Sequence, residues 1–142
     1  MEENLKQLLL KDLCARLPYG VICRYDTVVP LLGEVLNNGE LQEIRNRGKY
    51  FIVNGATCLY DDIKPYLRPM SSMTEAERSE LSEEVAKAES GISDEIANGF
   101  ITDIAMSSWT VVSYCLKKHL DINGLISKGL ALEAPEGIYN IN

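Results

Sequence analysis

The chain has 142 residues, of which 46% are hydrophobic, and a formal net charge of −7 at pH 7. This apolar content excludes wholesale disorder, and the length fits one compact unit. No run approaches the roughly 18 apolar residues of a membrane span, and glutamates stand where a signal peptide carries positive charge, so we expect a cytoplasmic protein with no membrane partner.

Residues 1–18 are predicted to form an N-terminal amphipathic helix. Leucines recur at spacings of three and four residues, which places them on one face. Pro18 is expected to end the helix because proline cannot continue it. The leucines of this face are Leu5, Leu8, Leu9, Leu13 and Leu17.

Residues 19–70 are predicted to form a small SH3-like β-barrel of four or five short antiparallel strands. Short segments rich in β-branched and aromatic residues alternate there with turn signals. The clearest signal is Asn37-Asn38-Gly39-Glu40, which predicts a tight hairpin, and Arg47-Gly48 and Asn54-Gly55 predict two further turns. So few short strands cannot fill two wide sheets, which favours a strongly bent barrel.

The end of this region predicts one helical turn followed by a short strand. Residues 60–64 fit the turn, with Asp61 or Asp62 as its cap, and Pro65 and Pro69 bracket an edge strand because proline cannot donate into a ladder. A meander, a single turn and a short last strand resemble the SH3-like barrels, including the Tudor and KOW types. That resemblance covers residues 20–69.

Residues 71–142 are predicted to be mainly helical, which makes the fold class α+β. Thr74 followed by Glu77 has the form of a capping box at a helix start. We expect Gly91 to end this helix, and we expect Ser107-Ser108 to be a candidate break in the next one. The apolar stripe of that second helix is expected to pack on the barrel; its members are Ile101, Ile104, Ala105, Trp109, Val112, Leu116 and Leu120.

The net negative charge lies in one segment. Residues 75–103 hold nine acidic side chains against Arg78 and Lys87, whereas charges cancel on either side. Direct nucleic-acid binding is disfavoured, because such binding relies on Lys and Arg neutralising phosphates. The segment is either a solvated helix or an acidic surface for a basic protein partner, with a nucleic-acid mimic as one form. The candidate acidic face consists of Glu77, Glu80, Glu83 and Glu84.

Four residues of the barrel region are candidates for a binding groove. Tyr50, Tyr60 and Tyr66 supply aromatic rings, and Arg68 supplies a cation with a planar face. Either these side chains line a groove for a peptide, a nucleotide or a base, or the rings close the barrel ends and pack on Trp109. The sequence leaves both interpretations open.

No catalytic residue, metal ligand set or cofactor motif is predicted. His119 is the single histidine and is interpreted as an ordinary residue at a helix end. The cysteines show no Cys-x-x-Cys pair and are expected to be buried, reduced thiols. Neighbouring acids on a helix point about 100° apart and seldom converge on one ion. The cysteines are Cys14, Cys23, Cys58 and Cys115, and the acidic doublets are Asp61-Asp62, Glu83-Glu84 and Asp94-Glu95.

Three blocks, at residues 11–23, 62–77 and 119–140, resemble an uncharacterised family of small proteins encoded by Bacteroides genomes and their prophages. The resemblance implies a phage or mobile-element accessory protein in a bacterial host cell, and it implies no established activity. The family often has a doubled histidine and an aromatic residue where this chain has Lys118, His119 and Leu120, which weakens the case for a histidine site.

Together these features predict a non-enzymatic protein that binds another protein. The alternative is a protein that sequesters a small ligand, such as a signalling nucleotide, at the junction of the barrel and the helices. The oligomeric state stays open, with a homo-oligomer among the options.

Overall fold

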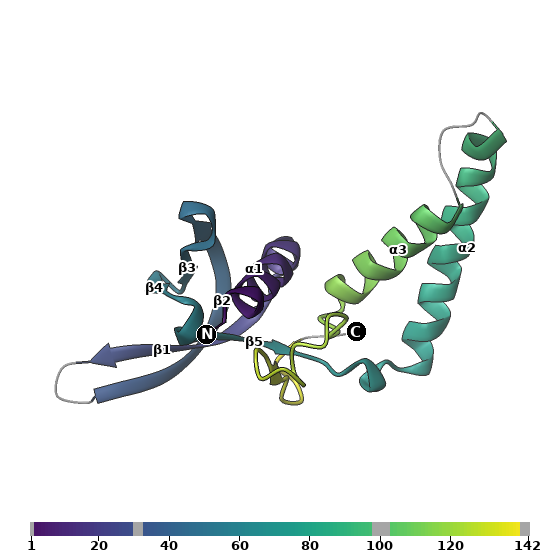
Figure 1. Ribbon diagram of the computed structural model, residues 1–142. Coiled ribbons are helices and arrows are strands. Elements are labelled where there is room, and N and C mark those ends of the chain that lie inside the picture. The colour runs from purple at the N-terminus through teal and green to yellow at the C-terminus, as the bar shows by residue number, and fades with distance from the viewer. Residues whose placement is uncertain (1, 30–32, 98–102, 140–142) are drawn as a thin grey trace.

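The computed structural model describes residues 2–29, 33–97 and 103–139 and shows an α+β fold. A helix lies against a curved six-stranded sheet, and two further helices stand side by side beyond it (Figure 1). These features confirm the predicted N-terminal helix and C-terminal helices. The elements are α1 (Glu3–Arg16), β1 (Ile22–Val29), β2 (Gly33–Arg45), β3 (Tyr50–Val53), β4 (Ala56–Cys58), β5 (Ile63–Leu67), α2 (Glu75–Ala97), α3 (Asp103–Lys117) and β6 (Leu132–Glu133), with 3-10 turns at Leu17–Tyr19, Asn46–Gly48, Tyr60–Asp62 and Met70–Ser72.

The sheet has the strand order β4-β3-β2-β1-β5-β6. All neighbouring pairs are antiparallel except β5 and β6, which are parallel. The long strand β2 pairs with β1 up to Glu40 and with β3 from Leu41 onward, and its register shifts between Leu41 and Glu43. Such a shift increases the local bend of a strand. Among the described strands β4 and β6 remain as edges, so the sheet is not closed into a barrel.

The predicted hairpin turn at residues 37–40 is wrong. These residues lie inside β2, where Asn38 is opposite Arg24 and Gly39 is opposite Cys23. The glycine serves a close approach: a Cβ at Gly39 would lie 2.3 Å from the side-chain nitrogen of Asn54. β1 and β2 instead stay paired out to Val29 and Gly33.

The other predicted turns are confirmed. Asn54 and Gly55 have φ of 50° and 78°, the left-handed pair that a two-residue hairpin loop needs between β3 and β4. A 3-10 turn occupies Tyr60–Asp62, and Asp62 Oδ2 accepts a hydrogen bond of 3.4 Å from the Leu59 amide. The predicted short strand is confirmed by β5, but its predicted place at the edge of the sheet is wrong, because the parallel strand β6 covers the outer side of β5.

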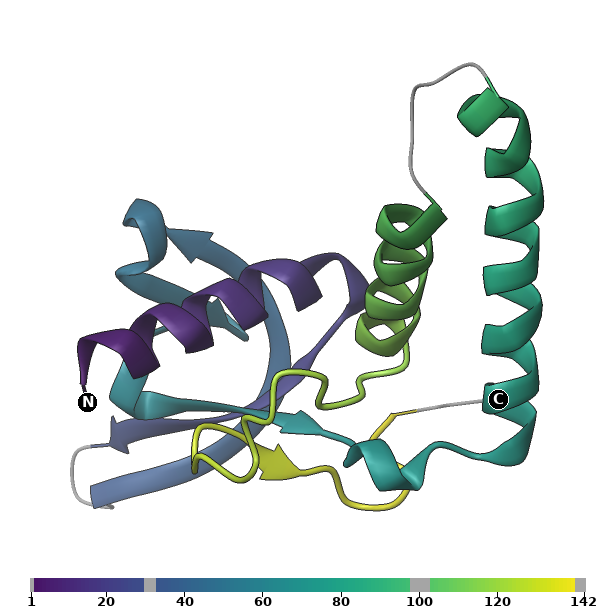
Figure 2. The same ribbon diagram turned by 45° about the vertical axis from the view of Figure 1, so that its right-hand side comes forward.

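The C-terminal helices differ from the prediction in three ways. α2 continues through Gly91 to Ala97, and α3 runs unbroken through Ser107-Ser108. Trp109 does not pack on the sheet; it is 67% exposed. The α2–α3 hairpin projects past the sheet (Figure 2), so the outer part of α3 lies beside α2 and beyond the sheet. Ile101 lies outside the described residues, as do the side chains of Ile104 and Ala105.

The hydrophobic core lies between α1, the sheet and the segment that follows α3. It draws on residues from near both ends of the chain, so segments far apart in the sequence pack together. Its buried members include Leu9, Leu13, Val21, Phe51, Val53, Ile63, Leu67, Leu125 and Leu130.

A buried ion pair joins α1 to the C-terminal segment. Arg16 is fully buried and donates from Nε to Asp12 Oδ2 at 2.7 Å. Its Nη2 also donates to the carbonyl of Leu120 at 2.8 Å, and Asn123 Nδ2 donates to Asp12 Oδ1 at 2.9 Å. Each charge is therefore partnered within the protein, which is the condition under which buried charges are tolerated.

Replacing Asp12 by alanine should strongly destabilise the fold. The change leaves the Arg16 guanidinium buried without its counter-charge, which typically costs about 3–5 kcal/mol in the free energy of unfolding. The exposed pair of Glu43 and Arg45 supplies the control, and Glu43→Ala should change that free energy by about 1 kcal/mol or less. Urea denaturation measures both variants, and equal effects would contradict the assigned role of Asp12.

Candidate functional site

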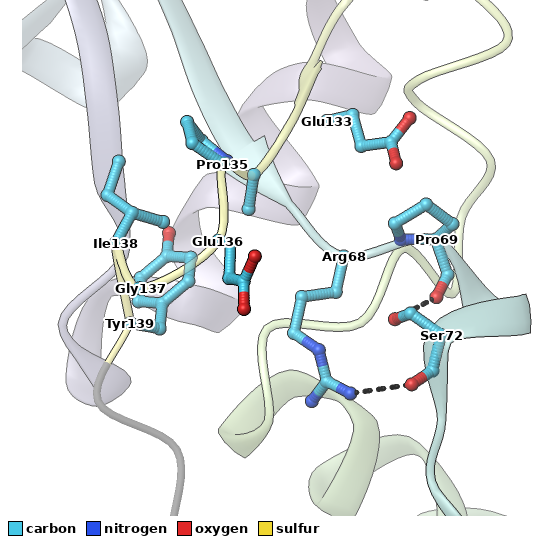
Figure 3. Close-up of a pocket in the computed structure, with 10 residues that line it drawn as sticks. Arg68, Pro69, Ser72, Glu133, Pro135, Glu136, Gly137, Ile138 and Tyr139 are labelled. Carbon is cyan, nitrogen blue, oxygen red and sulfur yellow. Dashed lines mark hydrogen bonds between the residues drawn. The ribbon is translucent and has the colours of Figure 1, made fainter.

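A pocket lies where the end of β5, the 3-10 turn at Met70–Ser72 and the loop at residues 133–139 meet (Figure 3). It has a volume of about 180 Å³. A neighbouring hollow of about 580 Å³ shares Arg68, Glu136 and Tyr139 with it and extends along α2 to Glu80 and Lys118. We call the two hollows together the junction pocket.

Arg68 forms one wall of the junction pocket and is held on all sides. Its amide donates to the carbonyl of His119 at 2.8 Å, and its carbonyl accepts from the amide of Asp121 at 2.8 Å. Its guanidinium makes a two-pronged ion pair with Glu77, at 2.8 Å and 2.7 Å. It also donates to the carbonyls of Lys118 and Ser72, the latter bond being drawn in Figure 3. The predicted role of Arg68 as a free stacking surface for a ligand therefore does not fit its geometry.

Glu77 combines a helix cap with this ion pair. Its amide donates to Thr74 Oγ1 at 3.1 Å and its carboxylate accepts from the Thr74 amide at 3.0 Å, which confirms the predicted capping box. The hydrogen bond from Arg68 lowers the pKa of Glu77 to about 2, against the smaller opposing effect of burial. Glu77 is 6% exposed, so it does not belong to an exposed acidic face as expected.

Tyr139 fixes the loop that forms the opposite wall. Its hydroxyl accepts from the Ile22 amide at 2.8 Å and donates to the carbonyl of Tyr66 at 2.7 Å. Its ring stacks on the His119 imidazole at a centroid distance of 3.7 Å. His119 is therefore a buried packing residue and not an exposed residue at a helix end. Burial, together with a smaller effect of nearby cations such as Arg16, lowers the pKa of His119 to about 4.

The three predicted groove tyrosines lie in separate environments. Tyr66 is buried, and its hydroxyl donates to Asn38 Oδ1 at 2.9 Å. Tyr60 packs edge-on against Phe51 with ring centroids 5.1 Å apart. Tyr50 is half-buried, with the ammonium of Lys49 5.4 Å from its ring centroid. The rings pack against the sheet and its neighbouring segments and do not line a common groove. They do not pack on Trp109.

The charges around the junction pocket disfavour an anion. Arg68 is neutralised by Glu77, and the ammonium of Lys118 lies 3.9 Å from a carboxylate oxygen of Glu80. Glu133 and Glu136 are exposed and also line the pocket. A phosphate would meet paired cations and free carboxylates, whereas a cationic group would meet complementary charge.

The α2–α3 hairpin carries a second candidate surface. Burial, followed by the nearby α2 carboxylates, raises the pKa of Tyr114 to about 12, so Tyr114 faces α2. A rotation of about 100° per residue places Trp109 and Val112 roughly 140° and 160° away from Tyr114 around α3. Leu116 shares their face and is buried, Val112 is 36% exposed and Trp109 is 67% exposed. The stripe is covered at its base and bare farther out.

The acids of α2 differ in their availability. Glu83 is exposed, Glu80 has a side chain 48% exposed, and Glu84 is half-buried. With Glu77 paired to Arg68, the predicted acidic face is reduced to Glu80 and Glu83, with Glu84 at its margin. We call Trp109 and Val112 the hairpin surface; Glu80 and Glu83 lie on the neighbouring helix α2, from which this face of α3 points away.

Sequence reasoning missed the residues of the loop wall. Glu136 and Tyr139 come from a segment that shows only a Pro-Glu-Gly turn signal, and no local pattern indicates that Tyr139 reaches Ile22. It was also wrong for Cys14, which is exposed, whereas the other three cysteines are buried as predicted.

Over residues 2–29, 33–97 and 103–139, no helix combines the length and apolar character needed to cross a bilayer. The same part of the chain holds no group of three or more His, Cys, Asp or Glu side chains arranged for a metal ion. A comparison of the chain with protein-family models, curated proteins and solved structures gives no match. The resemblance to a Bacteroides family stays a prediction.

Acid should weaken the fold through Glu77. The unfolded chain binds a proton at this residue near pH 4.5 and the folded chain only near pH 2, so its contribution is present above about pH 5 and is lost as pH falls toward 2. The loss should approach roughly 3 kcal/mol, since one pKa unit corresponds to about 1.4 kcal/mol. Glu77→Gln should flatten this part of the profile of unfolding free energy against pH.

Urea denaturation at several pH values between 7 and 3 measures the effect, and Glu83→Gln on the same helix is the control that should keep the wild-type slope. His119 acts in a higher pH window: its folded pKa of about 4 lies below its ordinary value of 6.5, so its contribution to stability is lost from about pH 6.5 down to 4 in all three proteins. An unchanged slope in Glu77→Gln below pH 4.5 would contradict the role of the Arg68 ion pair.

Proposed function

We propose that this chain is a non-enzymatic protein that binds another protein through the hairpin surface. The observation that carries the proposal is the exposure of Trp109, at 67%, on a helix pair that projects from the sheet. Tryptophan is enriched among the residues that dominate binding energy in interfaces. Burying a large apolar side chain typically contributes about 1.5–3 kcal/mol of free energy, which an exposed ring can still gain on binding. Val112 on the same face extends the apolar contact.

The charge of the hairpin favours a basic partner. Glu80 and Glu83 lie on α2 in the segment that holds the net charge of the chain. Complementary charge on a helix next to an apolar anchor acts over a distance, and it speeds association and suppresses wrong partners more than it adds affinity. We therefore assign the anchor to Trp109 and the selectivity for a basic surface to the α2 acids, with direct nucleic-acid binding disfavoured.

The wider setting of the proposal comes from sequence resemblance. The three blocks that resemble a family of Bacteroides genomes and prophages support a phage or mobile-element accessory protein acting in the cytoplasm of a bacterial host. An SH3-like origin of residues 20–69 is supported by β2, which is shared by two halves of the sheet, and by the 3-10 turn at Tyr60–Asp62 directly before β5. Both statements are proposals about ancestry.

Trp109→Ala should abolish most partner binding without harming the fold. A central tryptophan typically contributes about 2 kcal/mol or more, which corresponds to a roughly 30-fold loss of affinity. The unfolding free energy should change by about 0.5 kcal/mol or less because the ring is exposed. A tagged chain would recover the partner from host lysate, and interferometry with that partner would give Kd for each variant.

Leu59→Ala is the matched control, since Leu59 is a large exposed apolar residue, at 49%, on the loop between β4 and the following 3-10 turn. Glu83→Lys should slow association and reduce its salt dependence, with a smaller effect on dissociation. Equal affinities of the Trp109→Ala variant and the unaltered chain for the recovered partner would overturn the proposal.

A second candidate function is sequestration of a small ligand in the junction pocket, which the hollows between Arg68, Glu136 and Tyr139 support. The sequence suggests a signalling nucleotide as the ligand, but the charges around the pocket favour a ligand with a cationic group. Variants at Tyr66 or Arg68 would make poor tests, because Tyr66 is buried and Arg68 holds Glu77.

A thermal-shift panel separates the ligand classes. Polyamines and agmatine should raise the Tm of the protein, and nucleotides should leave it unchanged, because bound ligand stabilises only the folded state. Glu136→Gln should remove the shift, since Glu136 lines both hollows and is exposed. Glu43→Gln, on β2 and outside the junction pocket, should leave the Tm shift unchanged. A flat response to every cation tested would count against this function.

A further inference from the structure

A third hollow, of about 430 Å³, lies between α1 and the turn that follows β2. Leu10, Leu17 and Ile44 line it with apolar side chains, and Cys14 and Arg47 line it as well. Its volume falls within the range of about 300–1,000 Å³ that is typical of small-molecule sites. It shares no lining residue with the junction pocket, so it is a separate feature of the fold.

The turn at Asn46–Gly48 is built so that α1 can approach closely. Gly48 is buried with φ of +93°, and a Cβ there would lie 2.5 Å from Leu10 Cδ1. Only glycine fits both the backbone angle and the contact. The three apolar lining side chains, Leu10, Leu17 and Ile44, stay half-buried, so the hollow presents apolar surface to solvent.

Arg47 is held at this hollow in an unfavourable backbone conformation. Asn46 and Arg47 have φ of 52° and 56°, a left-handed conformation that residues with a Cβ rarely adopt. Strained residues of this kind gather at ligand-binding and switch regions. Within the described part of the chain Arg47 makes no ion pair and no side-chain hydrogen bond, in contrast to Arg45, which is paired with Glu43.

We propose that this hollow binds a small amphipathic carboxylate. The alkyl or aryl part of the ligand packs against Leu10, Leu17 and Ile44, and its carboxylate pairs with Arg47. An unpaired guanidinium beside apolar walls matches this chemistry, because its planar fork of donors fits a carboxylate at two points. The proposal is independent of the hairpin surface and of the junction pocket.

Cys14 provides the measurement. It is exposed at this hollow, whereas Cys23, Cys58 and Cys115 are buried, so alkylation of the native protein reports on one site. The probe is octanoate, and iodoacetamide labelling of Cys14 is followed by mass spectrometry at pH 9. At octanoate concentrations about ten times its Kd, roughly a tenth of the sites remain free, and labelling should slow by up to about tenfold with saturation.

Arg47→Gly is the decisive variant. Glycine adopts this backbone angle without strain, so the Tm should stay the same or rise, while the carboxylate loses its partner. Octanoate should then no longer protect Cys14. Arg45→Gln, two residues away, is the matched control and should keep full protection. Octanol and octylamine at the same concentration should protect neither protein.

Calorimetry of octanoate with Cys14→Ala gives a readout that does not depend on the thiol, and the same loss of binding should follow from adding Arg47→Gly. The proposal is overturned if octanoate neither slows labelling nor binds in calorimetry. It is equally overturned if octanol protects as well as octanoate, or if Arg47→Gly binds octanoate as the unaltered chain does.

Discussion

The structure depends on Arg68, which joins three parts of the fold at one residue. Its backbone, at the end of β5, forms hydrogen bonds with His119 and Asp121 in the segment after α3. Its guanidinium holds the first turn of α2 through the ion pair with Glu77. The same guanidinium binds the carbonyl of Lys118, next to the end of α3. Both helices of the projecting hairpin are thus fastened at their base to the sheet, whereas Trp109 lies farther out and is exposed.

Local chemistry could be predicted from the sequence where a signal and its partner lie within a few residues. The Thr74–Glu77 capping box and the Asn54-Gly55 turn are examples, because backbone geometry alone determines them. Glu77 also forms an ion pair with Arg68, and no short-range sequence pattern predicts that second interaction. Asn38-Gly39 shows the opposite case: a strong turn signal was overridden by a strand pairing and by the contact of Gly39 with Asn54.

The candidate sites were less predictable because they depend on which surfaces stay uncovered. The apolar stripe of α3 has the pattern of a core-facing helix, yet among its described members Leu116 and Leu120 are buried whereas Trp109 and Val112 are exposed, since α2 and α3 extend past the sheet. The turn at Arg47-Gly48 could be predicted from the sequence. The hollow beside it could not, because it arises from the packing of α1 on Gly48. The side-chain types of Tyr66 and Arg68 suggest a binding groove, but Tyr66 is buried and Arg68 is paired with Glu77.

The contacts of Tyr139 with residues far back in the sequence determine when folding can be completed during synthesis. Its hydroxyl bonds to Ile22, and Arg16 and Asp12 likewise receive partners from Leu120 and Asn123. A ribosome releases the chain from the N-terminus, so these contacts of α1 and the first strands form only after residues 120–139 have been released. Pairings so distant in sequence are slow to close. The nascent chain therefore carries an exposed Arg16–Asp12 pair and an uncovered β5 edge until the last residues of the fold arrive.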